Sequence, residues 1–292
     1  MAVILDQEVV RTVKELSGEA FYDTSLPTAL KNAQKFAGKI GFVASLPQLV
    51  QGRIVAPSDN EVWKNLYTAN SEENVGKTEQ GNNVLIVVHG GGIWTPKRIE
   101  QAYQENLTPQ YAGKLSKNEI KNLLAGKLAD ETLIPVFSYE DFTKQSKLPI
   151  RYAVVLDFDT AKKTESGYQN ADKLVENALF VVRAGGIEQA TAYVKKAKEV
   201  YKSNNLGNWH PLNNIDTNQE QGRVLFLNDV NGGFSSFIDF NGRFVGVAPE
   251  ALEARAKNLV APKLEQILKS AKGCVPEVAW KDFEERMSAF YK

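Results

Sequence analysis

Four short stretches of continuously apolar residues constrain the fold of this chain more than any other feature. They are rich in β-branched residues, they do not alternate with polar residues, and they cover residues 84–88, 152–156, 179–182 and 224–227. Strands with this pattern are covered on both faces, as in a sheet sandwiched between helices. Between them, helical patterns cover about residues 96–106, 116–129 and 187–202. The sequence therefore predicts an α/β fold with a mostly parallel or mixed sheet flanked by helices.

Three segments follow one another along the chain. Residues 1–82 are expected to form a mixed α/β segment of the same fold, in which a capping-box pattern at 58–61 predicts a helix. Residues 83–248 are expected to form the α/β core, and residues 249–292 a helical C-terminal segment.

The C-terminal segment carries two further signals. Pro262 is expected to break or kink it. Its last helix has an apolar face with Val278, Phe283, Met287 and Phe290. Such a face packs on the protein's own core or forms a surface for oligomerisation.

Composition excludes several classes of function. The 292 residues contain 35 basic and 35 acidic side chains, so no overall field favours nucleic acid or an anionic membrane as partner. A single cysteine, Cys274, excludes an intramolecular disulfide and a cysteine-rich metal site. Residues 1–10 do not fit a secretory signal, and the longest apolar run in the middle of the chain is far shorter than the roughly 20 residues of a membrane helix. A cytoplasmic location is therefore expected.

Two glycine-containing segments resemble each other. Residues 83–93 align without gaps with residues 177–187, and in each an apolar stretch is followed by a basic residue or histidine, a glycine pair and isoleucine. The match is either a convergence on a common turn from strand to helix or a trace of duplicated halves. In both cases the glycines are predicted to stand where a buried strand passes into a helix.

Glycines at such turns let a ligand approach the backbone, and the N-terminus of the next helix attracts an anion. The sequence therefore predicts an anion site, and its candidate residues are Gly90, Gly91, Gly92, Lys97, Arg98, Arg183, Gly185 and Gly186. Thr95 and Pro96 are expected to start the helix that places Lys97 and Arg98 in its first turn. Basic side chains that simply point into solvent are the alternative. Neither loop matches the nucleoside triphosphate or dinucleotide fingerprint.

The segment Val-Val-His-Gly-Gly-Gly-Ile-Trp at residues 87–94 resembles the oxyanion segment of the hormone-sensitive-lipase group of α/β-hydrolases. That resemblance implies loop amides that stabilise an oxyanion beside an attacking serine. The chain contains no Gly-x-Ser-x-Gly, so no serine nucleophile is identified for His210 to activate.

Asp157 and Asp159 follow a buried strand and share one face, so both carboxylates can point into one crevice. The segment resembles the first motif of haloacid-dehalogenase-type phosphatases, although Ala161 stands at its last position. Both residues are therefore candidate catalytic residues and ligands for Mg²⁺. The alternative is that they cap a turn or a helix.

The two histidines are further candidates. His89 ends a strand directly before the glycines, where an imidazole can act as acid and base or bind a phosphate oxygen. A buried histidine bonded to backbone carbonyls explains it as well. Trp209 and His210 lie in a long polar loop, where Trp209 either stacks on a ligand or fills the edge of the core.

These patterns favour one function over two alternatives. The preferred hypothesis is binding, with turnover left open, of a phosphorylated or otherwise anionic small molecule. It requires Gly91, Asp157, Arg183 and His210 to converge on one concave surface. A non-catalytic structural or interaction protein is the first alternative, and an esterase-like hydrolase is the second. Whether the chain is an enzyme stays open.

Overall fold

The computed structural model describes residues 18–39, 41–229, 232–248, 268, 269, 271 and 279–290. The chain divides into two compact units, Met1–Pro249 and Glu250–Lys292. Helix α13 (Trp280–Phe290) belongs to the second unit. Pro262, Val278 and the side chains of Met287 and Phe290 lie outside the described part, so the predicted kink and apolar face are not tested. No helix in the described part of the chain is long and apolar enough to cross a membrane.

The first unit is built on a large mixed sheet. Its strands run in the order β6-β7-β4-β3-β10-β11-β9-β8, and β5 pairs with β10. The strands are β3 (Tyr67–Lys77), β4 (Asn83–His89), β5 (Gly113–Lys114), β6 (Val136–Ser138), β7 (Tyr152–Asp157), β8 (Gly167–Asn170), β9 (Asn205–Asn208), β10 (Gln221–Leu227) and β11 (Phe234–Phe237).

Most neighbouring strands of this sheet are antiparallel. Among the described pairs, only β6 with β7 and β11 with β9 are parallel. The prediction of a mixed sheet is therefore confirmed, and the prediction of a mostly parallel sheet is wrong. Continuous apolar runs report burial on both faces, not strand direction, so the sequence pattern is the same in either case.

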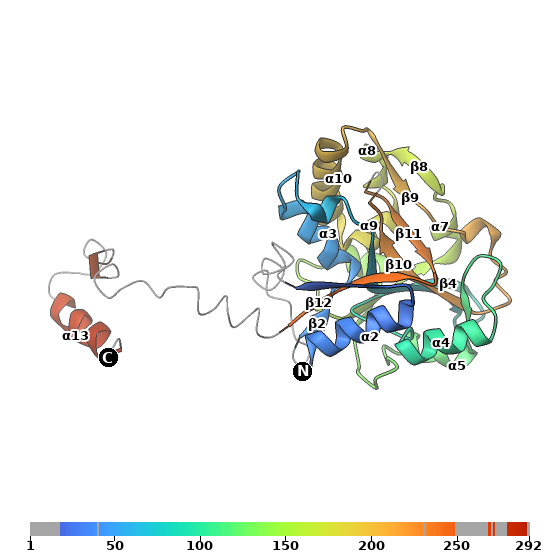
Figure 1. Cartoon of the computed structure of the whole chain (residues 1–292), viewed down its shortest axis with the longest axis horizontal. Helices are drawn as coiled ribbons and strands as arrows, with labels where there is room; N and C mark the ends of the chain where they lie inside the picture. Colours follow the sequence, from blue (N-terminus) through green and yellow to red (C-terminus); the bar gives the residue numbers. More distant parts are fainter. Residues whose placement is uncertain are drawn as a thin grey trace. The chain divides into compact units, whose positions relative to one another are not determined.

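Helices cover both faces of the sheet (Figure 1). One face is packed by α3 (Leu46–Val55), α9 (Ala178–Ala184) and α10 (Ile187–Tyr201), and the other by α2 (Leu26–Ala37), α4 (Pro96–Gln104) and α5 (Lys117–Leu124). Each face of the sheet has its own hydrophobic core, and the side chains of β4 alternate between them. Leu85 and Val87 lie in the first core, with α3, α9 and α10, and Ile86 lies in the second core, with α2, α4 and α5. Two-sided burial is the reason for the continuous apolar runs.

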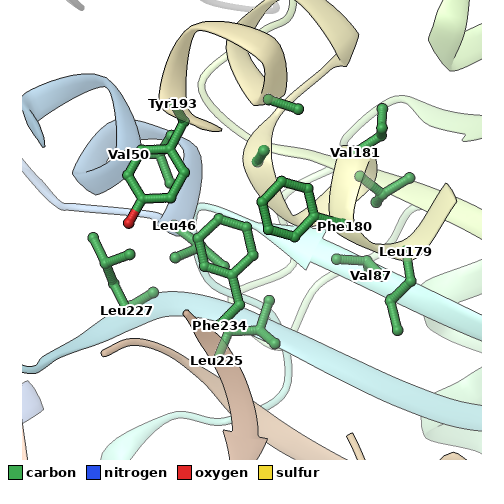
Figure 2. Close-up of a cluster of buried hydrophobic side chains, with 14 of the residues drawn as sticks. Leu46, Val50, Val87, Leu179, Phe180, Val181, Tyr193, Leu225, Leu227 and Phe234 are labelled. Carbon is green, nitrogen blue, oxygen red and sulfur yellow. The ribbon is translucent and has the colours of Figure 1, made fainter. Parts of the chain in front are cut away.

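Figure 2 shows part of the first core. Leu46 and Val50 of α3 and Phe180 of α9 pack there on strand residues such as Val87 and Phe234. The rings of Phe180 and Phe234 stack with centroids 4.6 Å apart. Burying a side chain of this size contributes roughly 1.5–3 kcal/mol.

A smaller antiparallel sheet joins the two ends of the first unit. Its strands are β1 (Glu19–Asp23), β12 (Gly242–Val247) and β2 (Phe42–Val43), in that order. Helix α2 packs against this sheet and buries Leu26, Leu30 and Ala33. Pro27 lies in the first turn of α2 and Gly38 ends it with a φ of 65°.

The central strand β3 is polar, and the hydropathy pattern of the sequence did not predict it. Thr68, Ser71, Glu72, Glu73 and Asn74 are all at most 3% exposed. The helix predicted after residues 58–61 is wrong. Only a single 3-10 turn, Glu61–Trp63, forms there. Ser71, Glu72 and Glu73 have hydrogen-bond partners on elements distant in sequence, whereas Asn74 donates to Glu72 of the same strand.

Residues 179–182 form helix α9, so the strand predicted there is wrong. The Asn177 side chain caps the helix by accepting from the amide of Phe180 at 3.0 Å, and Gly185 ends it with a φ of 92°. Every residue from Leu179 to Ala184 is buried. A helix buried all round has no polar face, so its pattern equals that of a buried strand. The segments 83–93 and 177–187 thus differ in structure despite their matching sequences.

The remaining helices in the described residues of the first unit are short. They are α6 (Tyr139–Thr143), α7 (Phe158–Lys162), α8 (Ala171–Leu174) and the 3-10 turn η3 (Leu212–Asn214). The predicted helices near residues 96–106, 116–129 and 187–202 are confirmed as α4, α5 and α10, with a capping box at Ser116 and Glu119.

Candidate functional site

The glycine loop after β4 binds a carboxyl group that belongs to the chain itself. The backbone amides of Ile93 and Trp94 donate to the two carboxylate oxygens of Glu72, at 3.0 and 3.1 Å. Glu72 is 2% exposed, and burial raises the pKa of its carboxyl while these two amides oppose the rise. A Cβ atom on Gly92 would stand 2.3 Å from Glu72 Oε1, so only glycine permits this approach. The amides of Gly90 and Gly91 also donate within the chain, to the carbonyl oxygen of Asn70, so four amides of the loop are occupied.

Lys97 and Arg98, the basic residues that follow this loop, do not form a joint anion site beside it. Arg98 donates from Nε to Glu119 at 2.8 Å and lies over the ring of Trp94. Thr95 caps α4 by accepting from the amide of Arg98. Lys97 is exposed to solvent. Arg98 is thus engaged by α5.

His89 is a buried histidine with protein partners on both ring nitrogens. Nδ1 lies 2.9 Å from Ser71 Oγ, and Nε2 lies 3.0 Å from the carbonyl oxygen of Val182. The residue is 0% exposed, and burial lowers its pKa to about 4. The geometry is that of the alternative considered for His89, a core histidine with satisfied hydrogen bonds.

Arg183 clamps a carboxylate of the protein. Its Nε and Nη2 donate to the two oxygens of Glu73 at 2.6 and 2.9 Å. Its Nη1 donates to Asn208 Oδ1 at 2.6 Å and to the carbonyl of Trp209 at 3.1 Å. Arg183 is 0% exposed, so this guanidinium joins α9 to β3 and β9 and presents no surface to a ligand.

His210 lies near the buried ion pair of Arg183 and Glu73. It is 6% exposed, and its Nε2 lies 2.9 Å from Thr164 Oγ1. Burial and the nearby charge of Arg183 lower the pKa of His210 to about 4. The histidine is therefore neutral at physiological pH.

Asp157 and Asp159 are exposed at the start of the short helix α7. The Asp157 carboxylate accepts from the amide of Thr160 at 2.8 Å, which is helix capping, the alternative considered for this pair. No group of three or more histidine, cysteine or acidic side chains that could hold a metal occurs in the described residues. Binding of Mg²⁺ at this pair stays a prediction.

The predicted site residues do not converge on one cavity. Gly90, Gly91 and Gly92 line a cavity of about 270 Å³, here called the glycine-loop pocket. Gly185 and Gly186 line a second cavity of about 520 Å³ between α3 and α10, here called the α3–α10 pocket. Ile150 lines both pockets. Neither pocket is lined by Asp157, Asp159, Arg183 or His210.

Among the lining residues of the α3–α10 pocket that were not predicted from the sequence, Gln48 and Tyr152 are buried and polar. They are 3% and 2% exposed. A signal for Gln48 was readable, because Ser45-Leu-Pro-Gln48 has the capping-box spacing. The structure has this capping box at the start of α3. Tyr152 opens the apolar run of β7, and nothing in that run distinguishes it from an ordinary core residue.

A second candidate surface is the outer face of the β8–β9 ribbon, here called the aromatic face. In this antiparallel pair Tyr168 is opposite Gly207 and Asn170 is opposite Asn205. Tyr168, Asn170, Asn205 and Trp209 are exposed, whereas Leu206 and Asn208 point inward and are 0% exposed. The rings of Tyr168 and Trp209 meet edge to face with centroids 5.1 Å apart. Trp209, a predicted ligand-binding residue, is thus on the surface.

The comparisons with known proteins give one similarity of fold. No protein-family model matches the chain, and no curated protein sequence matches it. A solved structure described as "Accommodation of massive sequence variation in Nanoarchaeota by the C-type lectin fold" is similar, with a TM-score of 0.61 and 28% identity. The similarity covers 79% of this chain and 97% of that one. The chain therefore shares the fold of a protein with the C-type lectin fold.

This similarity contradicts the predicted binding and turnover of a phosphorylated or anionic small molecule. The fold is that of a C-type lectin structure, not of an open parallel sheet with ligands at its strand ends. In addition, Glu72 occupies the amides of Ile93 and Trp94 in the glycine loop, and Glu73 occupies the guanidinium of Arg183. Four amides of the glycine loop donate to Glu72 and to Asn70, so these four are not free for the oxyanion of the esterase alternative. The similarity agrees better with the first alternative, a non-catalytic interaction protein.

Proposed function

We propose that this protein is a non-catalytic binding protein. The observation that carries the proposal is the similarity to a C-type lectin fold over 97% of the solved chain. The description of that structure attributes to the fold the accommodation of massive sequence variation. A scaffold that tolerates variation at its surface suits recognition, because contact residues can change while the core is kept.

We place the contact on the aromatic face. Its four exposed side chains, Tyr168, Asn170, Asn205 and Trp209, carry two aromatic rings and two carboxamides and no charge. Aromatic rings stack on apolar C–H surfaces, and carboxamides both donate and accept hydrogen bonds. This combination fits an uncharged ligand rich in hydroxyl groups, such as a neutral glycan.

The aromatic face is anchored to the core. The amide of Trp209 donates to the carbonyl of Phe234 at 2.8 Å, and the carbonyl of Trp209 accepts from buried Arg183 at 3.1 Å. The amide of His210 donates to Ser166 Oγ at 2.9 Å. A backbone held in this way loses little freedom when a ligand binds, which favours affinity.

An array of neutral glycans tests the proposal. The full chain and its variants Trp209→Ala, Tyr168→Ala and Tyr22→Ala are applied side by side. Tyr22 is 58% exposed on β1, outside the aromatic face, and is the matched control. We expect wild type and Tyr22→Ala to bind the same glycans, and the other two variants to bind about tenfold more weakly or worse.

Three results would contradict the proposed function. Wild type that binds no neutral glycan, or Trp209→Ala that binds as wild type does, contradicts the assignment of the face. Mass spectrometry of the recovered glycan is expected to show an unchanged molecule. A cleaved or modified glycan contradicts a non-catalytic role.

A further inference from the structure

The α3–α10 pocket has the size of a small-molecule site. Its volume is about 520 Å³, and ligand pockets are typically clefts of roughly 300–1,000 Å³. Pro47, Ile54, Phe142, Leu148 and Ile150 give it an apolar lining. One basic and one acidic residue, Lys147 and Glu188, also line it and balance each other in charge. The lining therefore favours an uncharged, partly apolar molecule.

Gln48 brings an unused hydrogen-bond donor to this pocket. Its Oε1 accepts from the amide of Ser45 at 2.8 Å, and that amide can only donate, so the orientation of the carboxamide is fixed. The Nε2 group is consequently the free end. It is buried and has no partner in the described part of the chain.

Tyr152 brings a second unused hydrogen-bond donor to the α3–α10 pocket. Its ring is held between aromatic neighbours, with the His89 centroid at 5.0 Å and the Phe142 centroid at 6.2 Å. Its hydroxyl is buried and has no partner among the described residues. Burial raises the pKa of Tyr152, so the hydroxyl stays protonated and able to donate.

Gln48 and Tyr152 thus bring two buried donors without partners in the described residues to one cavity. A buried polar group that lacks a hydrogen bond destabilises the folded state, so such groups are rare unless a ligand or water satisfies them. The pocket walls are also held in place, because Gln189 Nε2 of α10 donates to the carbonyl of Pro47 in α3 at 2.6 Å. The cavity is thus lined by fixed elements and carries two unsatisfied donors.

We propose that the α3–α10 pocket binds a small, uncharged, partly apolar molecule through a hydrogen-bond acceptor such as an amide carbonyl. Gln48 and Tyr152 donate to the acceptor, and the apolar wall holds the remainder of the molecule. No residue of the aromatic face lines this pocket, so the test of this site does not depend on whether the protein binds a glycan.

Fluorine NMR with two matched probes tests the site. Trifluoroacetanilide carries an aromatic ring and an amide carbonyl, whereas trifluorotoluene carries the ring alone. We expect the wild-type chain to bind the anilide about tenfold more tightly, the gain of a well-made hydrogen bond. Tyr152→Phe and Gln48→Glu remove one donor each while keeping the shape, and both are expected to lose that preference.

Two controls locate the binding. Tyr103→Phe removes a hydroxyl that donates to the carbonyl of Asp239, away from the pocket, and is expected to bind as wild type does. Ile187→Trp fills the pocket from a side chain that is 53% exposed, so it is expected to fold and to exclude both probes.

Thermal unfolding separates a ligand-binding hydroxyl from a structural one. Because the Tyr152 hydroxyl has no partner in the described part of the chain, Tyr152→Phe is expected to keep or raise the Tm. The proposal is overturned if wild type binds no anilide, if Tyr152→Phe and Gln48→Glu keep the preference for it, or if Ile187→Trp binds both probes unchanged.

Discussion

Arg183 and Glu73 form a doubly hydrogen-bonded ion pair in the centre of the first unit. Nε to Oε1 measures 2.6 Å and Nη2 to Oε2 measures 2.9 Å, and the side chains are 0% and 2% exposed. The pair joins helix α9 to the central strand β3. Burial by itself would raise the pKa of Glu73, but the Arg183 guanidinium holds it below the usual range. Glu73 is therefore ionised at neutral pH.

Glu73→Gln is expected to destabilise the protein strongly. The substitution leaves the Arg183 charge buried without its carboxylate, which costs about 3–5 kcal/mol. Urea unfolding followed by circular dichroism measures the loss. Glu140→Gln, which breaks the exposed pair with Lys144, is the control and is expected to leave the midpoint unchanged. Equal midpoints for the two variants would show that the buried pair adds no stability.

The protein is expected to lose stability as the pH falls from 6.5 to 4. His89 and His210 have a pKa of about 4 in the folded state, below the ordinary value of 6.5. The unfolded chain therefore binds more protons in this range, and each histidine removes up to about 3 kcal/mol across it. Unfolding free energies at pH 7.5, 6, 5 and 4 measure the effect.

Removing one of these histidines should flatten that profile. His210→Asn cannot be protonated, so its unfolding free energy is expected to change less between pH 6.5 and 4 than that of wild type. A His210→Asn profile parallel to the wild-type profile would contradict a lowered histidine pKa.

Gly92→Ala is expected to disrupt the glycine loop. The new Cβ would stand 2.3 Å from Glu72 Oε1, so the carboxylate must move away from the amides of Ile93 and Trp94. We expect a loss of about 1–3 kcal/mol in unfolding free energy. Glu72→Asp draws the carboxylate back by one methylene, so the two substitutions together should destabilise less than the sum of their separate effects. Strict additivity would show that they do not interact.

Asn177→Ala tests the cap that starts helix α9. Asn177 Oδ1 accepts from the amide of Phe180, and losing such a cap costs about 1 kcal/mol. Glu176→Ala changes the exposed neighbouring residue and is expected to be neutral. Chemical denaturation of both variants measures the difference, and equal stability of the two would contradict the capping role.

The amino-acid sequence by itself determined the elements whose signals are local. Continuous apolar runs identified β4, β7 and β10 because strands buried on both faces have no polar side. Capping residues and helical spacing identified α4 and α10 close to their observed bounds, and the start of α5, which ends at Leu124 and not at residue 129. These features depend on neighbours a few residues apart, so a single sequence contains them.

Only the tertiary structure decided which polar groups are paired inside. Glu73 and Arg183 are 110 positions apart, and the sequence around each residue does not indicate that the two form an ion pair. The same holds for Glu72, which fills the glycine loop that otherwise predicts a ligand site. Strand β3 is polar and buried, and α9 carries the charged residue Arg183 among buried apolar side chains. Local hydropathy indicates which segments are buried. Hydrogen bonds between residues distant in sequence determine which polar side chains can be buried, and therefore which polar groups stay free to bind a ligand.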